Sequence, residues 1–257
     1  MKQELTAGIQ LSSVKPYTQN EAGLRRTLLR LRAIGYKTAQ LQWHALSIPA
    51  AAVADALGEA EMRAVSLQEY THVVMADPAP YLALAEACRL EDVCVSGIPA
   101  EYMTPAGVAR FAAWIAPLGE RAAAMGCTLS FHPRWQELAE MEGRLVLTRL
   151  LEAAGPSLRV VLDFNHVIRA GLDGPSLLRA LSGRVDFIHC KDMTDAAREH
   201  SHLVPVGAGC VDWPPILAAA RGAGVRVAFA EQESWDGDAF AAMAQSRAYL
   251  TANGCRG

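Results

Sequence analysis

The sequence predicts a single (β/α)8 TIM barrel that spans residues 1–257 as one domain. Short apolar runs alternate with longer segments of helical period along the whole chain, and eight such βα units can be distinguished. No linker or low-complexity stretch interrupts them, and the length is close to the roughly 250 residues typical of this barrel. An open doubly wound sheet is the alternative architecture.

The first four units share one pattern of a short apolar strand and an amphipathic helix. Strands are expected at residues 7–13, 38–43, 62–69 and 92–99. Helices are expected at residues 21–35, 49–60, 80–90 and 104–126. In the first helix, Leu24, Leu28 and Leu31 keep helical spacing, and Gly35 stops the helix.

The last four strands end in side chains of the kind that bind metal ions. These strands are expected at residues 127–133, 159–166, 185–192 and 226–233, followed by helices at 143–155, 174–183, 214–224 and 238–254. Their ends carry His132, Asp163, His166, His189, Lys191, Asp192, Glu231 and Glu233. One such residue alone is more often a helix cap or a satisfied buried group. Because the carboxyl ends of parallel strands meet at one crevice, the set predicts one divalent-metal site, and its nitrogen and oxygen donors suit Mn, Zn, Co, Fe or Mg.

Composition limits the partners of the chain. With 24 Lys and Arg against 27 Asp and Glu, the formal net charge is −3 and no basic run is interleaved with aromatics, so no nucleic acid partner is expected. No signal peptide and no apolar run of about 18 residues occur, so no membrane partner is expected. The six cysteines are scattered and form no CxxC pair, which is typical of a reducing compartment. We therefore expect a cytoplasmic protein.

Five motifs occur in a fixed order in the second half of the chain: FHPRWQEL, LDFNH, HCKD, VGAGCVDWPPIL and AEQE. Near the start, GIQLSS and LLRLRAIGYKTAQL add a strand and a helix that ends in Gly-Tyr. Together these segments resemble the sugar phosphate isomerase/epimerase family, the xylose-isomerase-like TIM barrels. The resemblance covers nearly the whole chain, and it is specific for the family but not for a substrate.

The resemblance implies a divalent metal, often Mn, with ligands at Asp163, His189 and Glu231. The fourth ligand is less clear, because many members have a Glu on strand five where this chain has His132 within the strand and Glu137 beyond it. The second His of that family motif is Arg134 here. If strand alternation turns His132 toward the barrel mouth, His132 becomes the fourth ligand and Glu137 is free as an acid/base.

The expected chemistry is proton removal next to a carbonyl. A bound dication aligns two substrate oxygens, polarises the carbonyl and stabilises the enediolate. Glu137 and Glu231 are the candidate bases. Lys191 pairs with a developing oxyanion or a carboxylate, or it bridges to Asp192. By resemblance His166 binds a substrate hydroxyl; its structural alternative is a helix cap.

Three further residues are candidates for substrate contact. Arg198, in the long loop after strand seven, could meet a phosphate or a hydroxyl, or could be a solvated loop charge. Trp43 and Trp135 lie at or beyond strand ends, where a flat ring can stack on a sugar, although core packing explains them nearly as well.

The leading function is therefore a metal-dependent isomerase or epimerase of a keto-sugar or related polyol, acting through an enediolate. A lyase or dehydratase acting on an inosose or a 3-keto-glycoside by β-elimination is the alternative, since the same intermediate can expel a leaving group. A catalytically inactive sugar-binding barrel is a third reading, motivated by Arg134. The expected partner is a small-molecule carbohydrate, and a homo-oligomer is compatible with the sequence.

Overall fold

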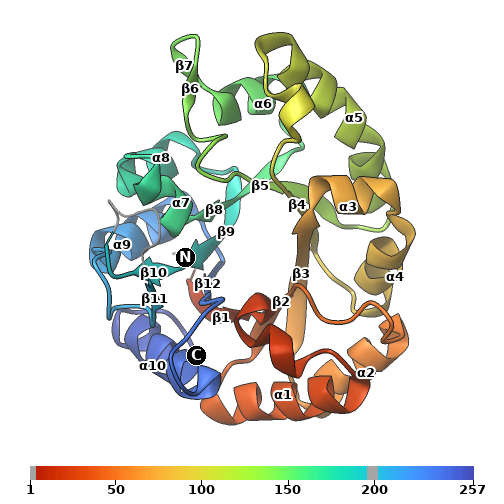
Figure 1. Ribbon diagram of the computed structural model, residues 1–257, viewed down its shortest axis with the longest axis vertical. Helices are drawn as coiled ribbons and strands as arrows, with labels where there is room; N and C mark the ends of the chain where they lie inside the picture. The colour runs from red at the N-terminus through yellow and green to blue at the C-terminus, as the bar shows by residue number, and fades with distance from the viewer. Residues whose placement is uncertain (1–3, 196–201) are drawn as a thin grey trace.

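A closed barrel of eight parallel strands forms the centre of the computed structural model, which describes residues 4–195 and 202–257 (Figure 1). Around the ring the strands are β1 (Thr6–Gln10), β12 (Val227–Ala230), β9 (Val185–Cys190), β8 (Arg159–Asp163), β5 (Thr128–His132), β4 (Asp92–Ser96), β3 (Arg63–Tyr70) and β2 (Thr38–Leu41). The strand β1 closes the ring by pairing with both β2 and β12. The predicted barrel is thus confirmed, and the open sheet is wrong.

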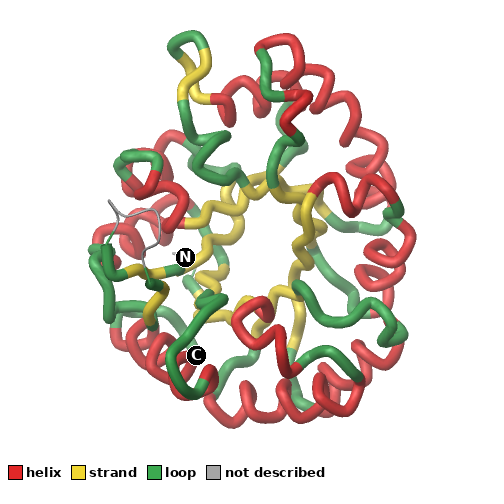
Figure 2. The backbone as a smooth tube through the Cα atoms, viewed as in Figure 1, coloured by secondary structure: helices red, strands yellow, loops and turns green. Residues whose placement is uncertain are grey.

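A ring of helices surrounds the strands (Figure 2). It consists of α1 (Glu21–Ile34), α2 (Ala50–Glu59), α4 (Ala79–Ala87), α5 (Pro105–Ala124), α6 (Val146–Ala154), α8 (Gly174–Ala180), α9 (Trp213–Ala223) and α10 (Ala239–Ala252). The helix α1 begins where the side chain of Asn20 accepts a hydrogen bond from the Gly23 N–H. It ends at Gly35, whose φ of 111° is left-handed, as the sequence predicted.

Several short elements were not predicted from the sequence. They are η1 (Leu11–Tyr17), α3 (Thr71–Ala76), η2 (Ala100–Tyr102), α7 (Phe164–Arg169), the hairpin of β6 (Glu140–Met141) with β7 (Arg144–Leu145), and the pair of β10 (Asp192–Met193) with β11 (Leu203–Val204). The expected strand 159–166 ends early at Asp163, because the Asp163 carboxylate accepts the Asn165 N–H at 2.7 Å and starts α7. In the described part of the chain, no helix combines the length and apolarity that a membrane span needs.

Below the ends of β8, β9 and β12, these three strands contribute apolar side chains to the barrel interior. Val161, Phe187 and Phe229 belong to one buried cluster in this interior. Because side chains alternate along a strand, the residues two positions later face the same way. Those residues are Asp163, His189 and Glu231. On these strands, the candidate metal ligands Asp163, His189 and Glu231 therefore lie directly above a layer of packed apolar side chains, at the carboxyl end of the barrel.

Candidate metal centre

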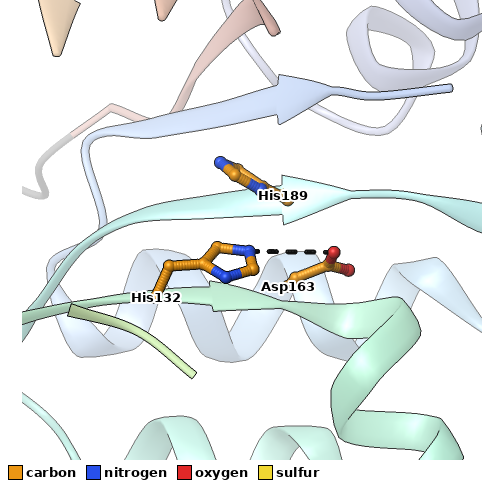
Figure 3. Close-up of side chains that lie close together, drawn as sticks. All are labelled: His132, Asp163 and His189. Atoms are coloured by element: carbon orange, nitrogen blue, oxygen red, sulfur yellow. Dashed lines mark ion pairs between the residues drawn. The ribbon is translucent and has the colours of Figure 1, made fainter. Parts of the chain in front are cut away.

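Three side chains from adjacent strands converge at this end of the barrel. His132 ends β5, Asp163 ends β8, and His189 lies in β9, where Asp163 and His189 are paired in register. One potential ligand atom from each lies within 4.8 Å of the others (Figure 3). The dashed line in Figure 3 joins His132 Nε2 and Asp163 Oδ2, which are 3.8 Å apart. A single ion could therefore reach all three.

Glu231, just after β12, completes the group. Its Oε2 lies 2.8 Å from His189 Nδ1, and all four side chains are buried. The structure thus brings together His132, Asp163, His189 and Glu231, the four residues expected as metal ligands.

The four side chains suit a cation because several of their buried atoms have no hydrogen-bond partner among the described residues. His132 Nε2, His189 Nδ1 and Glu231 Oε2 are buried and, within the described residues, have no hydrogen-bond partner. The short approach of His189 to Glu231 therefore lacks hydrogen-bond geometry. Burial is the main cause that holds the pKa of His132 well below its usual value, so the ring is neutral and can donate a lone pair. Buried polar atoms without a partner are unfavourable unless they bind a ligand. Imidazole nitrogens and carboxylate oxygens are ligands that suit a divalent metal.

Lys191 lies beside the metal-type group. Its Nζ is 3.5 Å from Glu231 Oε1 and 4.0 Å from Asp163 Oδ2, and it donates a hydrogen bond to Glu233. Burial lowers the pKa of Lys191, but the three carboxylates outweigh burial and raise it above its usual value. Burial alone would raise the pKa of Glu231, but the charge of Lys191 outweighs burial and lowers this pKa below its usual value. Lys191 is therefore a charged ammonium among carboxylates.

Asp192 faces away from Lys191 and organises the following loop. Its Oδ2 accepts hydrogen bonds from Trp213 Nε1 at 2.8 Å and from the Gly207 N–H at 2.9 Å. The alternative in which Lys191 bridges to Asp192 has no support in these contacts.

A pocket of about 190 Å³ opens above the group. Trp43, His166, Lys191, Glu233 and Tyr70 are among its lining residues. His166 Nε2 lies 3.8 Å from Asp163 Oδ2, and burial is the main cause that lowers the pKa of His166. Two of the expected substrate contacts, Trp43 and His166, thus lie at this pocket.

The structure does not bring Glu137 into the site. Glu137 is fully buried, its Oε1 accepts the Ile98 N–H and its Oε2 accepts the Arg134 N–H, both at 2.8 Å. A carboxylate bound through both oxygens to backbone ties two loops together, so the expected acid/base role of Glu137 lacks a geometric basis. Trp135 is exposed and does not line the pocket, and Arg198 lies outside the described residues.

Two further contacts of the site were not expected from the sequence. Gln40 Oε1 lies 2.6 Å from His189 Nε2, and Glu233 is the hydrogen-bond acceptor of Lys191. Glu233 follows Glu231 at a spacing of two, which is a signal that both face one way beyond the strand. Gln40 lies on a distant strand and carried no such signal.

A family model described as the xylose isomerase-like TIM barrel matches residues 28–252. The chain belongs to this family. TIM barrels in general carry their active sites at the carboxyl end of the strands, which is where the candidate metal ligands of this chain lie. No curated protein matches the sequence.

Solved structures show the same fold at low sequence identity. A sugar phosphate isomerase/epimerase from Parabacteroides distasonis has a TM-score of 0.79 at 16% identity, over 98% of this chain and 97% of that one. An L-ribulose 3-epimerase has a TM-score of 0.73 at 17% identity, over 97% and 94%. The probable 3-DHS dehydratase AsbF of petrobactin synthesis from Bacillus anthracis has a TM-score of 0.73 at 13% identity, over 96% and 99%.

Proposed function

We propose that this protein is a metal-dependent isomerase or epimerase of a keto-sugar or related polyol. The observation that carries the proposal is the buried group of His132, Asp163, His189 and Glu231, whose unpartnered donor atoms lie beneath a pocket lined by Lys191. The names of two similar structures, a sugar phosphate isomerase/epimerase and an L-ribulose 3-epimerase, support the same class. On this proposal the four residues hold a divalent metal, with Mn as the first candidate.

The metal, when bound, polarises the substrate carbonyl as a Lewis acid. Glu231 then removes the neighbouring C–H proton, because Ser12 Oγ at 3.3 Å and Lys191 leave it ionised and oriented. Lys191 stabilises the negative charge that develops on the substrate oxygen.

The Lys191–Glu233 pair takes the acid/base role that the sequence predicted for Glu137. Burial and the charge of Glu231 raise the pKa of Glu233, so this carboxylate takes up a proton from Lys191 more readily than a free glutamate and can return it. It lines the pocket and shares its proton network with Lys191. In an epimerase, this pair would deliver the proton to the opposite face of the intermediate.

The pocket walls favour a small polyol. Trp43 holds a left-handed backbone conformation with φ of 54°, and its Nε1 donates to Glu69 Oε1 at 3.3 Å. Tyr70 packs against it with ring centroids 6.0 Å apart. Flat aromatic faces beside a few polar groups are typical of sites that bind sugars. We propose that Trp43 and Tyr70 contact the apolar face of the substrate and that His166 binds one hydroxyl.

A lyase is the second candidate. The same proton removal can be followed by loss of the β-substituent, which leaves as water in the dehydration of an inosose and as the aglycone alcohol in elimination from a 3-keto-glycoside. The Lys191–Glu233 pair could protonate such a leaving group. The dehydratase among the structures of the same fold supports this alternative.

Metal analysis and NMR in heavy water test the proposal. Protein purified without chelator is expected to hold one equivalent of metal, or to bind added Mn²⁺. An isomerase or epimerase incorporates deuterium next to the carbonyl of its keto-sugar, whereas a lyase releases an unsaturated product. Absence of stoichiometric metal after Mn²⁺ addition, together with no exchange across keto-sugars and inososes, would refute the proposal and favour a sugar-binding barrel.

A further inference from the structure

A chain of hydrogen bonds runs through the barrel interior from the metal-type group to Asp92. His189 Nε2 lies 2.6 Å from Gln40 Oε1, Gln40 Nε2 donates to Ser66 Oγ at 2.9 Å, and Ser66 Oγ donates to Asp92 Oδ2 at 2.7 Å. All four side chains are at most 1% exposed. Because bulk water does not reach them, their hydrogen-bond directions must be consistent among themselves.

The direction of each bond follows from Asp92. Burial raises the pKa of Asp92 to about 6, so at neutral pH and above it is a carboxylate that can only accept. Ser66 must therefore use its one hydroxyl proton on Asp92. The Ser66 oxygen can then only accept from Gln40, so Gln40 turns its amide nitrogen to Ser66 and its oxygen to His189. The amide of Gln10 also donates to Gln40 Oε1, which favours the same orientation.

The ring nitrogen of His189 that faces Gln40 must carry the proton. Since Gln40 Oε1 only accepts, His189 is protonated on Nε2, and Nδ1 is left as a bare lone pair. That atom lies 2.8 Å from Glu231 Oε2 without a hydrogen bond.

We propose that Asp92, Ser66 and Gln40 form a positioning relay that fixes the Nε2–H tautomer of His189 and makes Nδ1 its metal-binding atom. The function of the relay depends on the proposed metal centre, but its hydrogen bonds do not depend on a bound metal. Groups that orient a ligating histidine in this way typically change metal affinity by about 10–100-fold when lost.

Two serines offer a matched test of the relay. Ser66 and Ser130 both donate to Asp92 Oδ2, at 2.7 and 2.8 Å, and both are buried, but only Ser66 also accepts from Gln40. The experiment compares Ser66→Ala with Ser130→Ala by 15N NMR of the imidazoles in metal-free protein at about pH 8, and by calorimetry with Mn²⁺. The relay predicts a single Nε2–H tautomer of His189 in wild type and Ser130→Ala. It predicts mixed tautomers and Mn²⁺ affinity weaker by about tenfold or more in Ser66→Ala.

Equal behaviour of the two serine variants would overturn the relay, as would a wild-type His189 protonated on Nδ1. Gln40→Met, which removes the acceptor, gives a second route if Ser66→Ala fails to fold, and it should reproduce the tautomer mixture. If wild type binds no Mn²⁺, the metal centre fails while the tautomer measurement still decides the relay.

A separate observation concerns Arg134, which borders two pockets. It lines the 190 Å³ pocket and a neighbouring pocket of about 210 Å³ that shares Tyr70 and Ser96 with it. Within the described residues the guanidinium makes no hydrogen bond, and its Nε is buried without a partner. Its nearest carboxylate oxygen, Glu137 Oε1, is 3.6 Å away and already accepts a backbone N–H.

The guanidinium of Arg134 is held in place by close packing on Gly97. A Cβ at Gly97 would lie 2.7 Å from Arg134 Cζ, and the φ of 76° there favours glycine. Of the two described Lys and Arg side chains that line the 190 Å³ pocket, Lys191 is already surrounded by carboxylates, so Arg134 is the one with unused hydrogen-bond donors. The geometry points to a substrate that carries a carboxylate or phosphate group bound by Arg134, which deepens the proposed function and depends on it.

Binding of simple probes tests Arg134. Glycerate and inorganic phosphate, compared with glycerol, are titrated by NMR into wild type, Arg134→Met and the exposed hairpin control Arg144→Met. The subsite predicts that one anion binds about tenfold more tightly than glycerol to wild type and Arg144→Met, and that Arg134→Met loses this difference. The anion that binds more tightly shows whether the subsite prefers a carboxylate or a phosphate. Anion binding that is equal in wild type and Arg134→Met overturns it. Deuterium exchange of neutral keto-sugars reports the proposed reaction independently.

Discussion

Replacing Glu137 by Gln distinguishes a structural carboxylate from a catalytic one. Its two oxygens accept the N–H groups of Ile98 and Arg134, each at 2.8 Å, at a site with no exposure. In Glu137→Gln, one oxygen becomes an NH2 group that faces a backbone donor, and the other hydrogen bond loses its charge. A charge-assisted hydrogen bond contributes about 1.5–3 kcal/mol, and a buried unsatisfied donor costs a similar amount. We therefore expect the free energy of unfolding to fall by about 3 kcal/mol.

Urea and thermal unfolding measure this loss. For a protein of this size, about 3 kcal/mol corresponds to a decrease in Tm of roughly 6–12 °C. The matched control is Glu140→Gln on the exposed hairpin strand β6, which should change Tm by about 1–2 °C at most. Mn²⁺ affinity and turnover of the folded Glu137→Gln protein should stay within about threefold of wild type, which corresponds to a free-energy difference of about 0.7 kcal/mol or less. Unchanged stability with turnover reduced by about 100-fold, the usual effect of losing a general acid or base, would refute this reasoning and restore Glu137 as the catalytic group.

Three further outcomes follow from the same contacts. His132→Ala should weaken Mn²⁺ binding by about 10–100-fold in calorimetry, and an unchanged affinity would remove His132 from the ligand set. Lys191→Met should cut turnover by about 100-fold while Mn²⁺ still binds; loss of the metal instead would make Lys191 a structural residue. Since burial raises the pKa of Asp92 from 3.8 to about 6, the folded protein binds this proton more tightly than the unfolded chain. The free energy of unfolding should therefore fall by about 2 kcal/mol through Asp92 as the pH rises from 4 to 6, and urea unfolding of Asp92→Asn should lack this decrease; parallel slopes would contradict it.

The barrel and the ends of its strands could be predicted because their signals are local. An apolar run that stops at a carboxylate, as at Asp163 and Glu231, carries both the strand and the direction of its last side chains in a few adjacent residues. The end of β8 was predicted too late, because Asp163 also caps α7, and a cap and a strand end look alike in the sequence.

The roles of Glu137 and Gln40 could not be predicted in the same way. Glu137 lies in the motif that also holds His132, but its role is decided by the Ile98 N–H, which belongs to another loop. Gln40 meets His189 only because the ring closes, so that β2, three strands away from β9 around the barrel, faces the same interior. Such contacts depend on the three-dimensional register of the barrel, which no local pattern specifies.

The charge balance at the carboxyl end of the barrel argues for a dication rather than a smaller charge. His132 is neutral, so the charges that face one another are the buried carboxylates of Asp163 and Glu231, the partly exposed carboxylate of Glu233 and the ammonium of Lys191. Lys191 offsets the carboxylate of Glu233, to which it donates a hydrogen bond, and leaves the charges of Asp163 and Glu231 uncompensated. Buried charge without a partner is strongly unfavourable, and a divalent ion at the bare nitrogens of His132 and His189 would neutralise the remainder. The same balance explains why Lys191 can stay charged beside a metal: it neutralises the carboxylate that the ion does not.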